Sequence, residues 1–209
     1  MIRLAKAPEP SILTANRAAW EVEFEAARTE GRRLPRRYAE EGIRLALQGE
    51  TDSKCAYCES RIRHVTTEHV EHIEPKSRRP DLLLEWSNLT IACPKCNQHK
   101  ADYHSVEVPL LNPYRDDPEE HLEFYGAIVL GKTLRGRVTV QRLELSRAGL
   151  LEPKAERIER LESLFCQWEG ESDPEVREYL ANQVRSEVEG RREFSATARS
   201  YLRMRGFDD

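Results

Sequence analysis

The first fifty residues carry apolar side chains at helical spacing. Trp20, Phe24 and Ala27 lie three and four positions apart, so they share one face of a helix that runs to about Thr29. A second helix is expected over about residues 36–49, with its apolar positions also on one face. Neither pattern brings catalytic side chains together. We therefore interpret both helices as packing elements.

The pattern changes in the middle of the chain. The segments LEFYGAIVLG and GRVTVQRLEL, within residues 122–145, contain β-branched residues in alternation with polar ones, and glycines lie between them. Alternation with period two is typical of strands that are buried on one face. This region therefore predicts a β-hairpin or strand pair.

Three stripes at helical spacing occupy the last sixty residues. One helix is expected over about 151–169, the next begins at the cap-and-proline signal Asp173-Pro174, and a third follows Gly190. The apolar stripe of the second consists of Val176, Leu180, Val184 and Val188. Cys166 lies among apolar residues of the first helix, which predicts a buried thiol.

Composition and charge narrow the function classes. The chain has 209 residues and a net charge of -4, so it lacks the basic signature of a nucleic-acid coat protein. No apolar run is long enough for a membrane helix and no secretory signal is recognisable, so we expect a cytoplasmic protein with no membrane partner. Three basic clusters interrupt the acidic background, and each taken alone is interpreted as a solvated surface. The clusters are Arg32, Arg33, Arg36 and Arg37; Lys76, Arg78 and Arg79; and Lys132, Arg135, Arg137 and Arg142.

Four of the five cysteines form two C-x-x-C pairs. Cys55 and Cys58 make one pair, and Cys93 and Cys96 make the other after an insert of 34 residues. Four thiolates form a closed tetrahedral site that suits structural Zn²⁺ and leaves no position for a substrate water. The insert is too short and polar to bury a core of its own, so we expect the zinc to hold this segment together.

The insert contains an acid-histidine pair followed by two asparagines. Glu71 and His72 come first, Asn88 follows sixteen residues after His72, and Asn97 comes directly after the last cysteine of the pairs. Imidazole titrates near neutral pH, so His72 can deprotonate a water if another group holds the cation. Neighbouring side chains point oppositely along a strand, so a bend or strand end must bring Glu71 and His72 to one site.

Over roughly residues 53–104 this arrangement resembles the HNH endonuclease family, in which two strands and a helix hold one divalent cation. The resemblance implies that His72 is the general base, that Glu71 and Asn97 are metal ligands, and that Asn88 ties the loop that orients His72. Both ligands offer oxygen, which favours Mg²⁺ or Mn²⁺. Family members often carry Asp or His where this chain has Glu71, and His where it has Asn97.

Residues around the motif are candidates for contact with nucleic acid. Lys76, Ser77 and Arg78 follow His72 closely, and Lys100 lies three positions after Asn97 on the same side of a helix. His99 lies two positions after Asn97 and is expected to face away from the metal. The remaining histidines lie off the motif and are interpreted as surface or packing residues: His64, His69, His104 and His121.

The resemblance extends beyond the core. The segments IRLAKAPEPSILTANRAAW, KCAYCESRIRHVTTEHVEHIEPKS and NPYRDDPEEHLEF are similar to HNH proteins of bacterial anti-phage defence, of the Septu (PtuB) and retron-associated types. Proteins of this kind typically act beside an ABC-type ATPase (PtuA-like), which the helical flanks here would dock. DNA is the more expected substrate, with RNA as the alternative.

These observations predict an α+β fold, mainly helical, with a central ββα-metal core stapled by a four-cysteine zinc site, a small β-hairpin and C-terminal helices. We expect an N-terminal helical extension over 1–52, the nuclease core over 53–104, and the hairpin with C-terminal helices over 105–209. Two other functions are open on the residues: a zinc-ribbon binding module without catalysis, and a thiol redox protein. The intact HNH positions argue against the first, and the lack of a βαβ context for C-x-x-C argues against the second.

Overall fold

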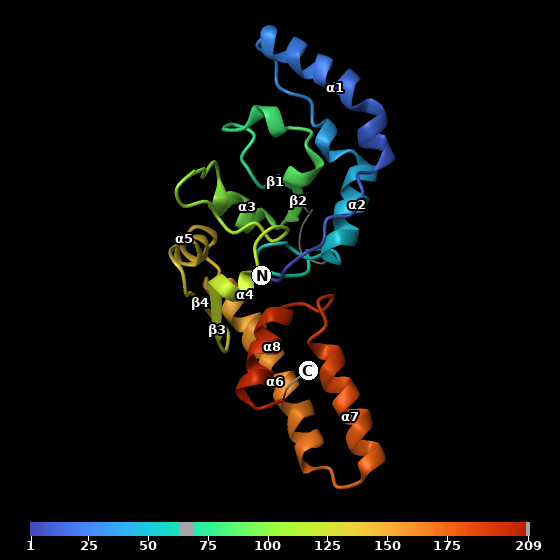
Figure 1. The fold of residues 1–209 in the computed structure, drawn as a ribbon, viewed down its shortest axis with the longest axis vertical. Helices are drawn as coiled ribbons and strands as arrows, with labels where there is room; N and C mark the ends of the chain where they lie inside the picture. Colours follow the sequence, from blue (N-terminus) through green and yellow to red (C-terminus); the bar gives the residue numbers. More distant parts are fainter. Residues whose placement is uncertain (63–68, 208–209) are drawn as a thin grey trace.

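The structure is a computed structural model that describes residues 1–62 and 69–207. Figure 1 shows an elongated arrangement with helix α1 (Ser11–Thr29) at one end and the C-terminal helices at the other. The strands β1 and β2 lie between these ends, beside helix α2 (Glu41–Thr51). The fold is thus α+β and mainly helical, as the sequence predicts.

A ββα unit forms the centre of the molecule. Strands β1 (His69–His72) and β2 (Leu89–Ala92) pair antiparallel, with Glu71 opposite Thr90 and His72 opposite Leu89. Helix α3 (Pro94–Lys100) follows β2 at once, because Pro94 occupies its first turn and the sulfur of Cys93 accepts from the Cys96 amide. The loop between the strands carries two short 3-10 turns, η2 (Pro80–Leu82) and η3 (Trp86–Asn88).

The expected second helix over 36–49 is interrupted. A 3-10 turn, η1 (Arg37–Ala39), comes first, and α2 begins only at Glu41 because Glu40 has an extended backbone (ψ 148°). The interruption lets the ring of Tyr38 turn inward against His72, where it is almost fully buried. Local periodicity could not reveal this break, because its cause is a contact with residues more than thirty positions away.

The strand prediction for residues 122–145 is half correct. The hairpin β3 (Leu122–Tyr125) and β4 (Ile128–Gly131) lies wholly within LEFYGAIVLG, whereas GRVTVQRLEL lies mostly in helix α5 (Leu134–Leu143). The hydroxyl of Thr133 caps that helix by accepting from the Gly136 amide. The buried positions of α5 are Gly136, Thr139 and Leu143, which is helical spacing.

Glycine explains the tight packing of α5 on the hairpin region. A Cβ on Gly136 would lie 2.1 Å from the carbonyl oxygen of His121, and a Cβ on Gly131 would lie 2.1 Å from the Arg137 amide nitrogen. No side chain fits in either place. The valines of this segment alternate in sequence, but tertiary packing selects the helix over their strand propensity.

Three helices complete the chain: α6 (Ala148–Gly170), α7 (Pro174–Glu187) and α8 (Ser195–Met204). Two expectations for them are wrong. Val176 is 44% exposed, and Ala181 takes its place in the buried stripe of α7. Cys166 is exposed, because it lies one position after the buried Phe165 and therefore about 100° further round the helix.

Two hydrophobic cores hold these elements. The larger draws buried residues from all three expected regions of the chain, including Leu13, Ile91 and Leu143. The smaller joins α6, α7 and α8 around Phe165, Val184 and Leu202.

A short helix α4 (Pro118–His121) links the ββα unit to the hairpin. Across residues 1–62 and 69–207, none of the helices has both the length and the apolar character needed to span a bilayer.

Candidate active site and zinc site

The two cysteine pairs converge at one point of the ββα unit. The sulfur atoms of Cys55, Cys58, Cys93 and Cys96 all lie within 4.8 Å of one another, and those of Cys58 and Cys93 are 3.8 Å apart. A tetrahedral zinc with Zn–S bonds of roughly 2.3 Å requires S–S edges of about 3.8 Å. All five cysteines are free thiols. The donor set and its spacing therefore fit a structural Zn²⁺.

The surroundings of the sulfur atoms suit thiolates. The guanidinium of Arg147 lies 3.6 Å from Cys96 Sγ and 3.8 Å from Cys93 Sγ, so it can balance negative charge on both. Hydrogen bonds with the neighbouring thiols lower the pKa of Cys58, whereas burial raises the pKa of Cys55. Three buried cysteines and the half-buried Cys93, beside the guanidinium of Arg147, supply the four sulfur donors of a closed zinc site.

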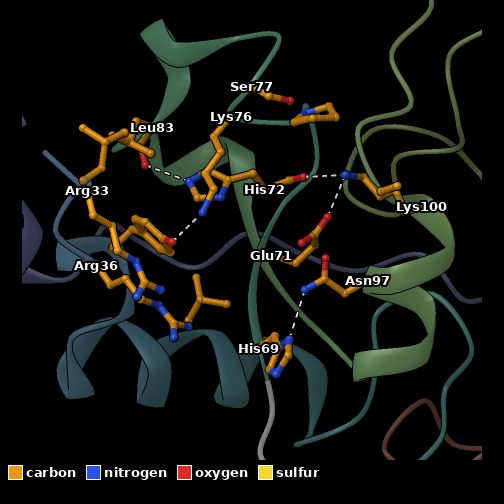
Figure 2. A pocket seen from close by; sticks show the side chains of 15 residues that line it. Arg33, Arg36, His69, Glu71, His72, Lys76, Ser77, Leu83, Asn97 and Lys100 are labelled. Atoms are coloured by element: carbon orange, nitrogen blue, oxygen red, sulfur yellow. Dashed lines mark hydrogen bonds and ion pairs between the residues drawn. The ribbon is translucent and has the colours of Figure 1, made fainter. Parts of the chain in front are cut away.

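A separate cavity of about 490 Å³ lies over β1 (Figure 2). It brings together nearly all the residues that the motif selects, along with side chains from the N-terminal region. Its lining consists of Arg33, Leu34, Arg36, Tyr38, His69, Val70, Glu71, His72, Pro75, Lys76, Ser77, Leu83, Asn97, Lys100 and Ala101. Glu71 and His72 line the cavity from opposite sides of β1, so the cavity extends over both faces of the strand and no strand end is needed to bring the two side chains together.

His72 is held by two contacts. Its Nε2 lies 3.0 Å from the carbonyl oxygen of Leu83, and its ring packs edge-on against Tyr38 with the centroids 4.6 Å apart. A carbonyl can only accept, so Nε2 carries the proton and Nδ1 keeps the lone pair. Burial lowers the pKa of His72 to about 4, which leaves the ring neutral at physiological pH. His72 is therefore a neutral imidazole whose Nδ1 lone pair can accept a proton.

Asn88 connects the loop that carries Leu83 to the end of β1. Its side-chain oxygen accepts from the Glu74 amide at 2.7 Å, and its side-chain nitrogen donates to the carbonyl oxygens of Glu74 and Leu82 at 3.1 and 3.3 Å. The residue is buried. Asn88 thus holds Leu82 in place. The next residue, Leu83, provides the carbonyl that accepts from His72.

Three potential cation donors face one another on the other side of β1 (Figure 2). Glu71 lies on β1 and Asn97 on α3, and the side-chain nitrogen of Asn97 lies 3.1 Å from Nδ1 of His69. His69 and Glu71 share a face of β1 because they are two positions apart. We name Glu71, Asn97 and His69 the cradle.

A lysine lies against the cradle. Lys100 donates to Glu71 at 2.6 Å and to the carbonyl oxygen of His72 at 2.8 Å, and its side chain is 2% exposed. Burial raises the pKa of Glu71, and the ammonium of Lys100 partly opposes that rise. One carboxylate oxygen of Glu71 bonds to Lys100, which leaves the second for a cation. Together with the amide oxygen of Asn97, the donor set fits a hard divalent cation.

The expected nucleic-acid contacts lie in different surroundings. Lys76 lines the cavity, and its ammonium donates to the hydroxyl of Tyr38 at 2.7 Å. Ser77 lines the cavity and is exposed. Arg78 forms an exposed ion pair with Asp102 at 2.9 Å. Lys100 is the exception, since its ammonium is buried against Glu71 and not at the cavity mouth.

Sequence reasoning missed several lining residues. His69 was placed off the motif, although period-two spacing from Glu71 on a strand could have identified it. Arg33 and Arg36 belong to a basic cluster interpreted from the sequence as a solvated surface, and Tyr38 has no local signal, because only the tertiary fold brings these residues to the cavity.

The remaining histidines lie outside the cavity lining. His99 faces Glu144 at 3.5 Å, away from the cradle as expected, and His104 contacts Glu74 at 2.6 Å. His121 contacts Thr133 at 2.7 Å. His64 lies outside the described residues.

Comparison with known proteins agrees with this geometry. Residues 55–102 match the family model described as HNH endonuclease. The chain is similar to a Septu protein PtuB from Bacillus thuringiensis, with 37% identity over 105 residues that cover 50% of this chain and 41% of the relative. It is also similar to a Septu protein PtuB from Bacillus mycoides (strain KBAB4), with 33% identity over 161 residues that cover 59% of this chain and 55% of the relative.

The matched stretches thus span about half the length of these relatives. Within this chain, the family match begins at the first zinc-site cysteine and ends just after α3, so it contains the four cysteines, β1, β2 and the cradle. Through residues 55–102, the chain is similar to the HNH endonuclease family.

Proposed function

We propose that this chain is a metal-dependent endonuclease that hydrolyses phosphodiester bonds, with DNA as its substrate. The observation that carries the proposal is the division of one cavity by β1. A neutral, oriented histidine lies on one side, and a carboxylate, an amide and a second imidazole face one another on the other. A simple binding module has no use for this division of roles.

His72 acts as the general base in the proposed reaction. Its Nδ1 takes a proton from a water as the water oxygen attacks phosphorus and the bond from phosphorus to the leaving oxygen breaks. The carbonyl of Leu83 and the ring of Tyr38 hold the imidazole in the orientation that exposes Nδ1. Asn88 supports this orientation through the loop, so we assign it a positioning role.

The cradle would hold the divalent cation through Glu71 and Asn97, and His69 would become a third donor on release of its Nδ1 from the Asn97 amide. When bound, the cation supplies positive charge against the negative charge that grows on the phosphate and leaving oxygens. Lys100 keeps the carboxylate of Glu71 aimed into the cradle, because it bridges that carboxylate and the backbone of His72. An imidazole among the donors favours Mn²⁺ over Mg²⁺.

We further propose a cytoplasmic role in anti-phage defence beside an ABC-type ATPase of the PtuA-like kind. The similarity to proteins named Septu PtuB supports this role. Lys76, Ser77 and Arg78 follow the general base directly and are proposed to contact the nucleic-acid backbone.

The test is cleavage of plasmid DNA and of a structured RNA by the zinc-loaded full chain, with and without the ATPase, in Mn²⁺, in Mg²⁺ and in EDTA. We expect cleavage of DNA that requires the added cation and is lost in His72→Ala. Cleavage of RNA alone would change the substrate assignment. A wild-type chain that binds nucleic acid but never cleaves it, under any of these conditions, would favour the zinc-ribbon binding module.

A further inference from the structure

The segment between α1 and η1 forms one wall of the active-site cavity. Arg33 and Arg36 lie in this segment and line the same cavity as His69, Glu71 and His72. Figure 2 shows both arginines across the cavity from Glu71, Asn97 and Lys100, on the side of β1 where His72 lies. A part of the chain outside the HNH match therefore supplies side chains directly to the reaction site.

These two arginines differ from their neighbours in charge pairing. Arg32 donates to Glu30, and Arg37 donates to Glu23 and Glu40. Arg33 and Arg36 are exposed, and across residues 1–62 and 69–207 no carboxylate pairs with either guanidinium. In this short stretch the acidic side chains thus pair with the arginines outside the cavity lining, and leave unpaired the two that line it.

The other charged side chains of the cavity do not neutralise Arg33 and Arg36. Glu71 is matched by Lys100, whereas the ammonium of Lys76 contacts the neutral hydroxyl and ring of Tyr38 and pairs with no carboxylate among residues 1–62 and 69–207. The cavity therefore has a local excess of positive charge in a chain whose net charge is -4. A guanidinium binds phosphate through two parallel hydrogen bonds, which gives orientation as well as affinity.

We infer that Arg33 and Arg36 form a phosphate clamp that holds the backbone of the cleaved strand beside His72, so that the N-terminal extension is one half of the nucleic-acid site. This inference rests on the proposed nuclease function, because it takes nucleic acid as the substrate. Since phosphates carry no sequence information, the clamp sets the position of the strand and not the sequence that is cut.

The test measures the binding of a short labelled DNA duplex by fluorescence anisotropy, over a series of salt concentrations, with the zinc-loaded full chain. Each lost phosphate contact reduces the slope of log K against log salt by about 0.9 for duplex DNA, so the Arg33→Ala/Arg36→Ala variant should lose about 1.8. Its affinity at low salt should fall by at least roughly tenfold, because two charge-assisted contacts disappear.

The matched control is Arg28→Ala/Arg32→Ala, which removes the same charge from arginines paired with Glu25 and Glu30 and lying outside the cavity lining. It should keep the wild-type slope. A second variant, Arg33→Lys/Arg36→Lys, keeps the charge but loses the paired hydrogen bonds. It should keep most of the slope while binding more weakly than wild type, which also shows that the loop still folds.

Cleavage by the wild-type chain separates the two ways of failing. If wild type cleaves the duplex and Arg33→Ala/Arg36→Ala binds it with an unchanged slope, the clamp is wrong and the nuclease proposal stands. An equal loss of slope in the control variant would also overturn the clamp, since net charge alone would explain the binding. If wild type neither binds nor cleaves nucleic acid, both proposals fall together.

Discussion

The zinc site and the cradle are neighbours in one ββα unit, yet they differ in almost every property. The zinc site uses four identical sulfur donors from two short pairs, with their sulfur atoms within 4.8 Å of one another. The cradle consists of a carboxylate, an amide and an imidazole from β1 and α3. One oxygen of the carboxylate already accepts a hydrogen bond from Lys100. A closed thiolate site holds a fold together, whereas a mixed and incomplete site leaves ligand positions for substrate and water.

The largest expected effect separates the two sites by stability. Cys93→Ala should lose the bound zinc and the cooperative folding of the ββα unit, because structural zinc contributes roughly 10–16 kcal/mol in small zinc-dependent folds. Elemental analysis and thermal unfolding measure both losses. Cys166→Ala is the control, since it removes an exposed thiol outside the cluster. One zinc per chain and an unchanged melting temperature in Cys93→Ala would contradict the structural role.

The second prediction concerns the base beside the cradle. His72→Ala should reduce the cleavage rate by roughly 10²–10⁴ and leave binding of metal and DNA nearly intact, because a general base is not a ligand. Glu71→Ala should instead weaken the cradle, so that added Mn²⁺ restores part of its activity. Cleavage rate against Mn²⁺ concentration distinguishes them. Rescue of His72→Ala by metal, with none for Glu71→Ala, would reverse the two roles.

The third prediction uses the pKa of His72, which burial lowers to about 4. The unfolded chain takes up a proton on this ring as the pH falls through about 6.5, whereas the folded chain does not until about pH 4. Stability from this group is therefore complete above pH 6.5 and is lost towards pH 4, by up to roughly 3 kcal/mol. Denaturant unfolding at each pH gives the free energy of unfolding, which should fall less steeply from pH 6.5 to pH 4 in His72→Gln than in wild type. Equal pH dependence of this free energy in the two proteins would refute the lowered pKa.

The smallest expected effect tests the third donor of the cradle. His69→Ala should weaken Mn²⁺ binding by at least roughly tenfold, a size typical even of residues that only support a ligand. Weakening of Mg²⁺ binding should be smaller, because Mg²⁺ prefers oxygen. Electron paramagnetic resonance of free Mn²⁺ measures this without an activity assay. His104→Ala, outside the cavity lining, is the matched control. Equal Mn²⁺ affinity in wild type and His69→Ala would leave the cradle with two protein donors.

Much of this molecule was predictable because its chemistry is local. Cys55 and Cys58 are three positions apart, as are Cys93 and Cys96. This short spacing lets the two sulfur atoms of each pair lie close together without help from distant parts of the chain. Glu71, His72, Asn88 and Asn97 could be selected because their order and spacing resemble the HNH family, and the structure brings three of them to the cavity while Asn88 supports the loop behind it. The long amphipathic helices were predictable from periodicity for the same reason.

The errors occurred where distant parts of the chain decide the outcome. The segment after β4 is a helix because Gly131 and Gly136 let it approach the hairpin region more closely than any side chain would permit. Cys166 is exposed because the buried stripe of α6 passes through Phe165 and not through its neighbour. Neither fact can be derived from residue type alone, since both depend on which face another element covers.

By itself, the sequence determined the donor chemistry: four thiolates in two pairs, an acid beside a histidine, and two asparagines at set intervals. Tertiary structure alone decided which further groups meet that chemistry. It placed Lys100 against Glu71, His69 against Asn97, and Arg33 and Arg36 across the cavity. The physical reason is range: spacing along a strand or helix constrains side chains within a few residues, whereas a cavity wall built from distant segments exists only after the core has packed.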